Sequence, residues 1–163
     1  MKNQNRGIPG SLIILLLIFT ITAVNGQEGK PDFTGRWLQD TVKTALPEGG
    51  GYQQWGADYF TISQSNFQIT RTRIGPEGNS RVFKYNLDGT ESVNTSPRGE
   101  SRSVATWSDD GRKLRIVTTY SIQGTVRTST EVWTLSTPST LTIEATRQGP
   151  NGEVKSTMVY GKK

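Results

Sequence analysis

The stretch KLRIVTTYSIQGTVRTSTEVWTL, residues 113–135, indicates the fold of this protein most clearly. β-Branched and aromatic residues alternate with polar ones on both sides of Gln123-Gly124. Glycine readily adopts the positive φ angle that a tight hairpin turn requires. The pattern therefore predicts a β-hairpin, with strands over residues 113–122 and 125–135.

Two registers of this hairpin agree with the pattern. A two-residue turn pairs Leu114 with Trp133, whereas a three-residue turn with a bulge opposes Ile116 and Val132. Because side chains alternate between the faces of a strand, a slip of one residue moves a whole set of side chains to the other face. The sequence alone leaves both registers open.

The same alternation recurs along the chain. From Phe33 onward, no window has apolar residues at helical spacing for three turns. Turn sequences such as Asp88-Gly89 and Asp110-Gly111 separate the alternating segments. With the hairpin included, ten strands are predicted, over residues 33–42, 58–63, 67–74, 81–87, 91–95, 101–107, 113–122, 125–135, 141–147 and 154–160.

The links between these strands determine the topology that we expect. All but one are too short for a crossover helix, so neighbouring strands must be antiparallel. The exception, residues 43–57, is rich in Gly and Pro and is interpreted as an open loop or lid. We predict an all-β, antiparallel up-and-down meander of about eight to ten strands that closes into a barrel, because closure removes exposed edges. A β-sandwich is the alternative.

The composition excludes several kinds of chemistry. The 163 residues include no Cys and no His, so a Ser-His-Asp triad, a Cys nucleophile, a disulfide and a thiolate or imidazole metal site are impossible. Asp88, Asp109 and Asp110 lie in ordinary turn sequences. We therefore expect no metal site and no cofactor.

The N-terminal segment resembles an export signal. Lys2 and Arg6 precede an apolar run over residues 11–24, which is shorter than the roughly 20 residues that span a bilayer. We expect a signal peptide over residues 1–26 and one exported domain over residues 27–163, secreted or periplasmic and without a membrane span. The alternative is an uncleaved N-terminal anchor.

The charge balance argues against a nucleic-acid partner. The whole chain has a net charge of +5, which falls to +3 without Lys2 and Arg6. The remaining basic residues are scattered among Thr and Ser instead of forming a cluster. The resulting electrostatic field is too weak for a nucleic-acid-binding surface.

One face of the predicted sheet combines large apolar residues with charged ones. If Ser65-Asn66 is a two-residue turn, Ile62 faces Ile69 on this side of the sheet, and Phe60 faces Arg71. An unpaired buried charge costs several kcal/mol, so a solid core would not contain such arginines. A partly wet interior could hold them.

These polar residues are the candidate ligand site. Guanidinium groups with tyrosine hydroxyls can clamp a carboxylate or another anionic head group. The alternative is that the arginines lie over the rim and cover Trp with their stems. The candidate ligand-binding residues are Arg71, Arg73, Tyr120, Arg147 and Tyr160.

The start of the first predicted strand carries a recognisable motif. The sequence Asp32-Phe33-Thr34-Gly35-Arg36-Trp37, with the pattern F-x-G-x-W, resembles the N-terminal signature of the calycin superfamily, which includes lipocalins and fatty-acid-binding proteins. The later chain is similar to small exported bacterial lipocalin-like proteins. The resemblance implies a barrel that holds small, mostly apolar molecules.

The resemblance also implies structural roles. Gly35 would allow a tight entry to the first strand, and Trp37 would plug the barrel floor. In lipocalins an Arg near the chain end packs across this Trp, which makes Arg147 its expected counterpart. The disulfides and C-terminal helix of lipocalins have no equivalent here. The two helices that fatty-acid-binding proteins insert after their first strand are replaced by the Gly- and Pro-rich loop.

Three functions follow as hypotheses. The first is an exported, non-catalytic protein that binds a small hydrophobic or amphipathic molecule, or an anionic apolar one, in its barrel cavity. The second is a domain with a filled barrel that acts through its surface, as an inhibitor or an envelope-associated partner. The third is an enzyme that uses carboxylates such as Glu131 and Glu144. If Glu131 faces inward, we expect it beside Arg127 or Arg147.

Overall fold

The computed structural model describes residues 29–46, 59–75, 78–97, 99–149 and 152–163. The predicted signal peptide and most of the predicted lid, residues 43–57, lie outside these ranges. The ten predicted strands are confirmed, with shifted ends. Their bounds are β1 Gly35–Gln39, β2 Tyr59–Gln64, β3 Gln68–Ile74, β4 Ser80–Asn86, β5 Glu91–Ser96, β6 Gly99–Trp107, β7 Lys113–Ile122, β8 Thr125–Thr137, β9 Thr140–Gly149 and β10 Gly152–Lys162.

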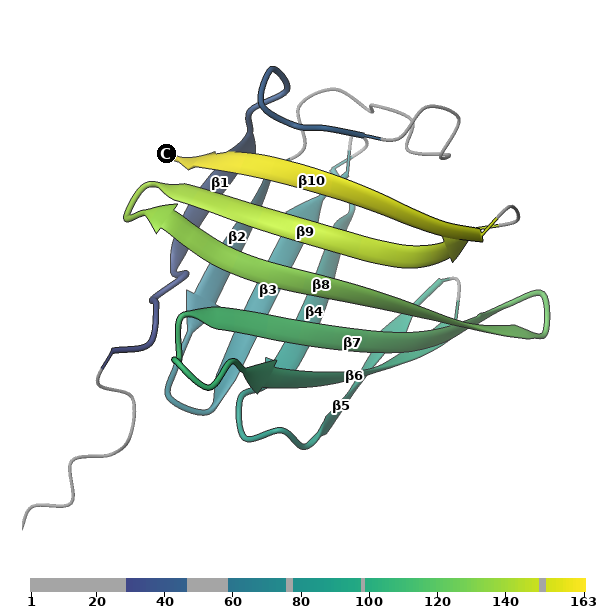
Figure 1. Ribbon diagram of the computed structural model, residues 1–163. Coiled ribbons are helices and arrows are strands. Elements are labelled where there is room, and N and C mark those ends of the chain that lie inside the picture. Colours follow the sequence, from purple (N-terminus) through teal and green to yellow (C-terminus); the bar gives the residue numbers. More distant parts are fainter. Residues whose placement is uncertain (1–28, 47–58, 76–77, 98, 150–151) are drawn as a thin grey trace, which may run out of the picture.

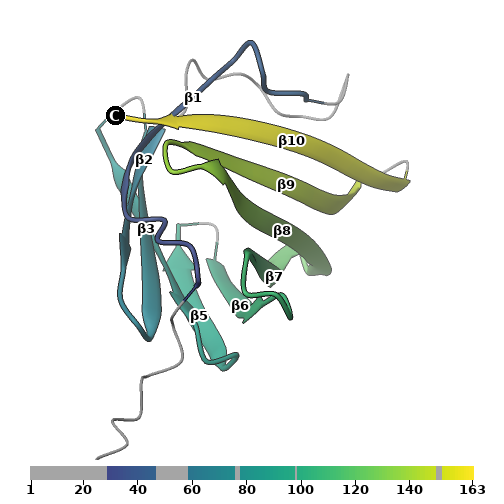
Figure 2. The ribbon, with the colours of Figure 1, turned by 60° about the vertical axis from the view of Figure 1, so that its left-hand side comes forward.

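The strands form one antiparallel sheet in the order β4-β3-β2-β1-β10-β9-β8-β7-β6-β5. This order is an up-and-down meander in which β10 returns to pair with β1. The sheet curls, so that β1–β4 form one wall and β6–β10 the opposite wall (Figures 1 and 2). The structure is therefore a nearly closed barrel and not a β-sandwich.

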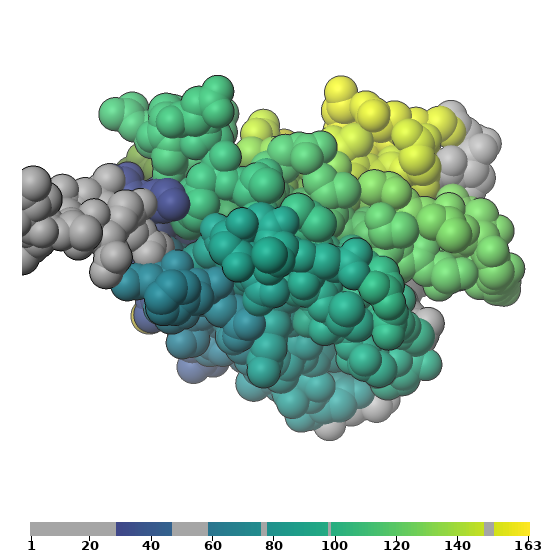
Figure 3. Space-filling view, turned by 90° about the horizontal axis from the view of Figure 1, so that it is seen from below, coloured from purple at the N-terminus to yellow at the C-terminus, as the bar shows by residue number. Residues whose placement is uncertain are grey.

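The barrel closes between β4 and β5 through side chains. The Lys84 N–H donates to Asn94 Oδ1 at 2.7 Å, and Asn94 Nδ2 donates to the Lys84 carbonyl at 3.0 Å. The Asn86 N–H donates to Ser92 Oγ at 2.8 Å. We call this the β4–β5 seam. In the space-filling view, the segments of β3 to β6 lie against one another on one face (Figure 3).

The hairpin of β7 and β8 adopts the register of a two-residue turn. Leu114 pairs with Trp133, and the alternative that opposes Ile116 and Val132 is wrong. Both turn residues have positive φ angles, 50° at Gln123 and 79° at Gly124. This geometry matches the twist of the flanking strands, which explains why the shorter turn is adopted.

The predicted two-residue turn at Ser65-Asn66 is wrong. The link between the end of β2 and the start of β3 has three residues, 65–67, and within the hairpin the Ser65 N–H donates to the Gln68 carbonyl at 2.9 Å. Phe60 consequently pairs with Arg73, and Arg71 pairs with Ile62. The Ser65 hydroxyl accepts hydrogen bonds from the Phe67 and Gln68 N–H groups, which favours the longer turn. Because side chains alternate along a strand, a register shift of two residues leaves each side chain on the face predicted for it.

The hydrophobic core fills one end of the barrel. Phe33 stacks on Trp107 with ring centroids 6.0 Å apart and meets Trp133 edge-on at 5.7 Å. Trp37 is completely buried, and its indole N–H donates to the Phe33 carbonyl at 2.9 Å. The F-x-G-x-W motif thus lies in the closed end of the barrel.

Candidate ligand-binding interior

The inner face of β6 to β9 changes from apolar to polar along the strands. The strand registers place its residues in successive layers across the sheet. The first layer is apolar, the second mixed and the third polar. Listed from β6 to β9, they are Trp107, Leu114, Trp133 and Ile143; then Ala105, Ile116, Glu131 and Ala145; then Ser103, Thr118, Ser129 and Arg147.

An ion pair connects the two walls of the barrel at the mixed layer, between the apolar and the polar layers. Arg71 Nη1 on β3 donates to Glu131 Oε2 on β8 at 3.0 Å. The Trp133 indole N–H donates to the same oxygen at 2.8 Å. Glu131 therefore faces inward, but the expectation that Arg127 or Arg147 is its partner is wrong. Arg71 reaches it because the barrel places β3 opposite β8.

Aromatic rings surround the Arg71 guanidinium. Its central carbon lies 5.2–5.8 Å from the ring centroids of Phe60, Phe83, Tyr85 and Trp133. Such contacts stabilise a desolvated cation by about 0.5–2 kcal/mol each. Among the described residues, nothing accepts a hydrogen bond from the buried Arg71 Nε. Arg71 is an interior residue and does not lie over the rim.

The surroundings keep this cluster in defined protonation states. Burial acts to lower the pKa of Arg71, but the opposing effect, led by the charge of Glu131, outweighs it, so the pKa lies above its ordinary value. Burial raises the pKa of Tyr85 to about 12, even though Arg71 acts in the opposite direction. Arg71 is therefore charged and Tyr85 neutral at neutral pH.

The predicted site residues fall into separate groups. Tyr160 belongs to the cluster around Arg71, because its ring centroid lies 4.8 Å from that of Phe60, and Phe60 contacts Arg71. Arg73 follows Arg71 on the same face of β3 but is exposed. Tyr120 and Arg147 are half-buried on the opposite wall. The part that these residues play in ligand binding stays a prediction.

The sequence reasoning missed two of the aromatic residues around Arg71, Phe83 and Tyr85. Phe83 and Tyr85 alternate along β4 and lie opposite Arg71 and Ile69 of β3. Their spacing of two residues was the available signal for a shared face. Nothing in the sequence indicated that Glu131, 60 residues away, completes the cluster.

The cation over Trp37 is Lys162, and the expectation of Arg147 is wrong. Lys162 lies opposite Trp37 in the β1–β10 register, with Nζ 5.4 Å from the ring centroid. Arg147 pairs with Val154, which precedes Lys162 by eight residues in β10. Gly35 has a φ angle of 149°, and a Cβ atom there would collide with the Lys162 stem.

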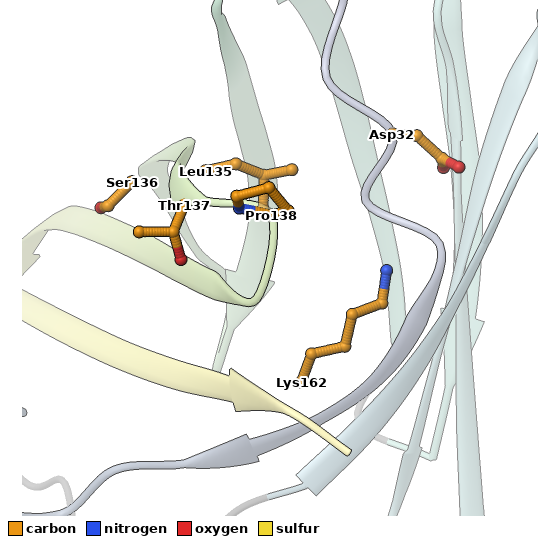
Figure 4. Close-up of a pocket in the computed structure, with 6 residues that line it drawn as sticks. All are labelled: Asp32, Leu135, Ser136, Thr137, Pro138 and Lys162. Carbon is orange, nitrogen blue, oxygen red and sulfur yellow. The ribbon is translucent and has the colours of Figure 1, made fainter.

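A cleft of about 520 Å³ lies at the closed end of the barrel, away from the polar layer. Lys162 points into the space between the β8–β9 turn and the segment around Asp32 (Figure 4). The pKa of Asp32 is held below its usual value, mainly by a hydrogen bond from the Thr34 side chain, and Lys162 adds to this effect. None of the predicted ligand-binding residues lines this cleft.

The part of the chain that the structure describes holds no group of three or more carboxylates that could bind a metal ion. In the same ranges, no helix has the length and apolar character to cross a membrane.

Comparison with known proteins identifies the fold. No family model and no curated protein matches the chain. A zebrafish ileal bile acid-binding protein, complexed with cholic acid, superposes with a TM-score of 0.63 at 18% identity, over 80% of this chain and 98% of that one. The chain has a calycin-like barrel fold. The lipocalin-like fold that the F-x-G-x-W motif implied is thereby confirmed.

A second solved structure has a similar fold. An abundant heat soluble (SAHS) protein from Ramazzottius varieornatus superposes with a TM-score of 0.62 at 12% identity, over 82% of this chain and 96% of that one. At such identities the similarity shows the fold alone.

Proposed function

We propose that this protein is an exported, non-catalytic carrier that holds a small amphipathic anion inside its barrel. The observation that carries the proposal is the change of the inner face from apolar to polar, with the Arg71–Glu131 pair at the boundary. Ligand pockets typically combine an apolar lining with a few placed polar groups. An amphipathic molecule matches both parts of this face.

The charge of the inner face favours an anion. Arg71 is neutralised by Glu131. Arg73 and Arg147 extend the same faces of β3 and β9 toward the polar end, so this end carries two more guanidinium groups. Guanidinium groups bind carboxylates through short, charge-assisted hydrogen bonds.

The fold comparison supports a carrier. The zebrafish protein was solved in complex with cholic acid, an amphipathic acid. A barrel of the same architecture can therefore hold a molecule of this class. Export rests on the N-terminal segment, in which Lys2 and Arg6 precede the apolar run.

Native mass spectrometry of the protein purified from its own host tests the proposal. We expect an additional mass that remains bound in the native spectrum and disappears on denaturation. The denatured protein should have the mass of residues 27–163, which reports cleavage after Gly26. An empty protein that also binds no amphipathic acid in calorimetry would favour the surface-acting domain with a filled barrel.

A further inference from the structure

Three hydroxyl groups form a continuous line across the inner face. Ser103, Thr118 and Ser129 are direct neighbours on β6, β7 and β8, and we call them the hydroxyl belt. Residues opposite each other on one face have Cβ atoms about 4.5–5.5 Å apart. Arg147 on β9 continues the line beside Ser129. A ligand in the polar end of the barrel would face hydroxyls and a guanidinium in one row.

The belt has unused hydrogen-bonding capacity. Ser103 is buried and shares a hydrogen bond of 2.9 Å with Thr118, which orients the Thr118 hydroxyl. In the described part of the chain, the half-buried Ser129 hydroxyl makes no hydrogen bond to another residue, and neither does that of Tyr120. A hydroxyl offers one donor and two acceptor sites, so water or a ligand must satisfy these groups.

Glu131 offers an acceptor directly below the belt. Its Oε2 receives both the Arg71 and the Trp133 hydrogen bonds, and no described residue donates to Oε1. The Glu131 side chain is 26% exposed. An ionised carboxylate only accepts hydrogen bonds, so Oε1 matches a donor on the ligand and repels a ligand carboxylate.

We infer that the ligand is a hydroxylated anion, whose hydroxyl groups bind Glu131 and the hydroxyl belt and whose anionic group lies toward Arg147. The inference rests on the proposed carrier function and adds a ligand class and an orientation. An unsubstituted aliphatic chain in this position would displace water from Glu131 and the belt without replacing its hydrogen bonds.

Two acids with the same skeleton and carboxylate test the inference. Cholate carries three hydroxyl groups and lithocholate one, and both can be titrated into the full chain by calorimetry below their micellar concentrations. Because lithocholate is the more apolar acid, an apolar cavity would prefer it. We expect cholate to bind at least about fivefold tighter, since each hydrogen bond changes affinity by about 2- to 12-fold.

A double variant connects this preference to the belt. Ser103→Ala with Thr118→Val removes both partners of one hydrogen bond together, so no buried hydroxyl is left unpaired. We expect its cholate affinity to fall by about 2- to 12-fold, while its lithocholate affinity stays within twofold. Thr119→Val, at an exposed position on the other face of β7, is the control and should change neither affinity. Circular dichroism establishes that the variants are folded.

The outcomes separate the inference from the carrier function. If wild type binds both acids equally, or lithocholate more tightly, the carrier function stands and the hydroxylated ligand is rejected. If the preference for cholate survives in the double variant, the assignment to the belt is wrong. If neither acid nor any other amphipathic anion binds, the proposed function and the inference fail together.

Discussion

Arg71 shows how a small barrel keeps a charged side chain in its interior. It has one carboxylate partner, Glu131, and four aromatic rings around the guanidinium. The carboxylate compensates for the desolvation that burial imposes, and the rings attract the cation through their faces. Its position between the apolar and polar layers makes it the floor of the proposed ligand site.

A double-mutant cycle measures this pair. Glu131→Gln should lower the free energy of unfolding by about 2–4 kcal/mol, because it leaves the buried Arg71 charge uncompensated while Glu131 itself is partly exposed. Arg71→Met with Glu131→Gln should be less destabilising than the sum of the single changes, by about 0.5–3 kcal/mol. Urea denaturation of the four proteins gives the coupling. Additive effects would show that the two side chains do not stabilise each other.

Tyr85 should make the protein sensitive to alkaline pH. Burial raises the pKa of Tyr85 to about 12 in the folded state, above the ordinary value of 10. The folded state then keeps a proton that the unfolded state releases, so stability is full below pH 10 and declines as the pH rises toward 12. Two pKa units correspond to about 3 kcal/mol.

Denaturation at several pH values between 9 and 12 tests this prediction. Tyr85→Phe has no proton to release at this position, so its stability should decline less steeply over the same range. Equal slopes for the variant and wild type would contradict the prediction.

At the scale of elements, local sequence patterns predicted the strands well and their long-range contacts poorly. Gln123-Gly124 correctly indicated the turn between β7 and β8, and β7 has the bounds that the alternation of apolar and polar residues predicted. The prediction of a two-residue turn at Ser65-Asn66 was wrong because the Ser65 hydroxyl stabilises a longer link. The dipeptide Ser65-Asn66 gives no indication of these hydrogen bonds. The β4–β5 seam could not be anticipated at all, since it depends on how far the sheet curls.

The seam should contribute strongly to stability. Asn94→Ala removes both hydrogen bonds to the Lys84 backbone and leaves its N–H without a partner, which should lower the free energy of unfolding by about 2–4 kcal/mol. Hydrogen exchange should show the Lys84 amide protected in wild type and fast in the variant. Thr95→Ala, an exposed position on the same strand, is the control and should stay within 0.5 kcal/mol. An unchanged Lys84 amide would mean that β4 and β5 are held together in another way.

For the whole molecule, the barrel combines a filled apolar end with a polar end that carries hydroxyl and guanidinium groups. The filled end supplies stability through buried aromatic rings. The polar end adds little to the core, and its side chains form the proposed ligand site. This division of one inner face suits a carrier, which must stay folded whether or not its ligand is bound.

Ligand binding should therefore raise the melting temperature without a change of fold. A ligand present at 100 times its Kd adds about 2.7 kcal/mol of stability. For a chain of this size, that corresponds to an increase in Tm of roughly 5–15 °C. Calorimetry with cholate measures the shift, and Arg147→Met should reduce it, whereas Arg115→Met on the outer face of β7 should not. An equal shift in both variants would remove Arg147 from the site.

The amino-acid sequence by itself determined the strands, most of their turns and the antiparallel meander, because side-chain alternation, turn chemistry and short links act over a few residues. Only the tertiary structure decided which charges meet. Arg71 pairs with Glu131 and Lys162 covers Trp37 because the curvature of the sheet brings distant strands together. Curvature and stagger are sums of small twists along all the strands, so no local pattern contains them.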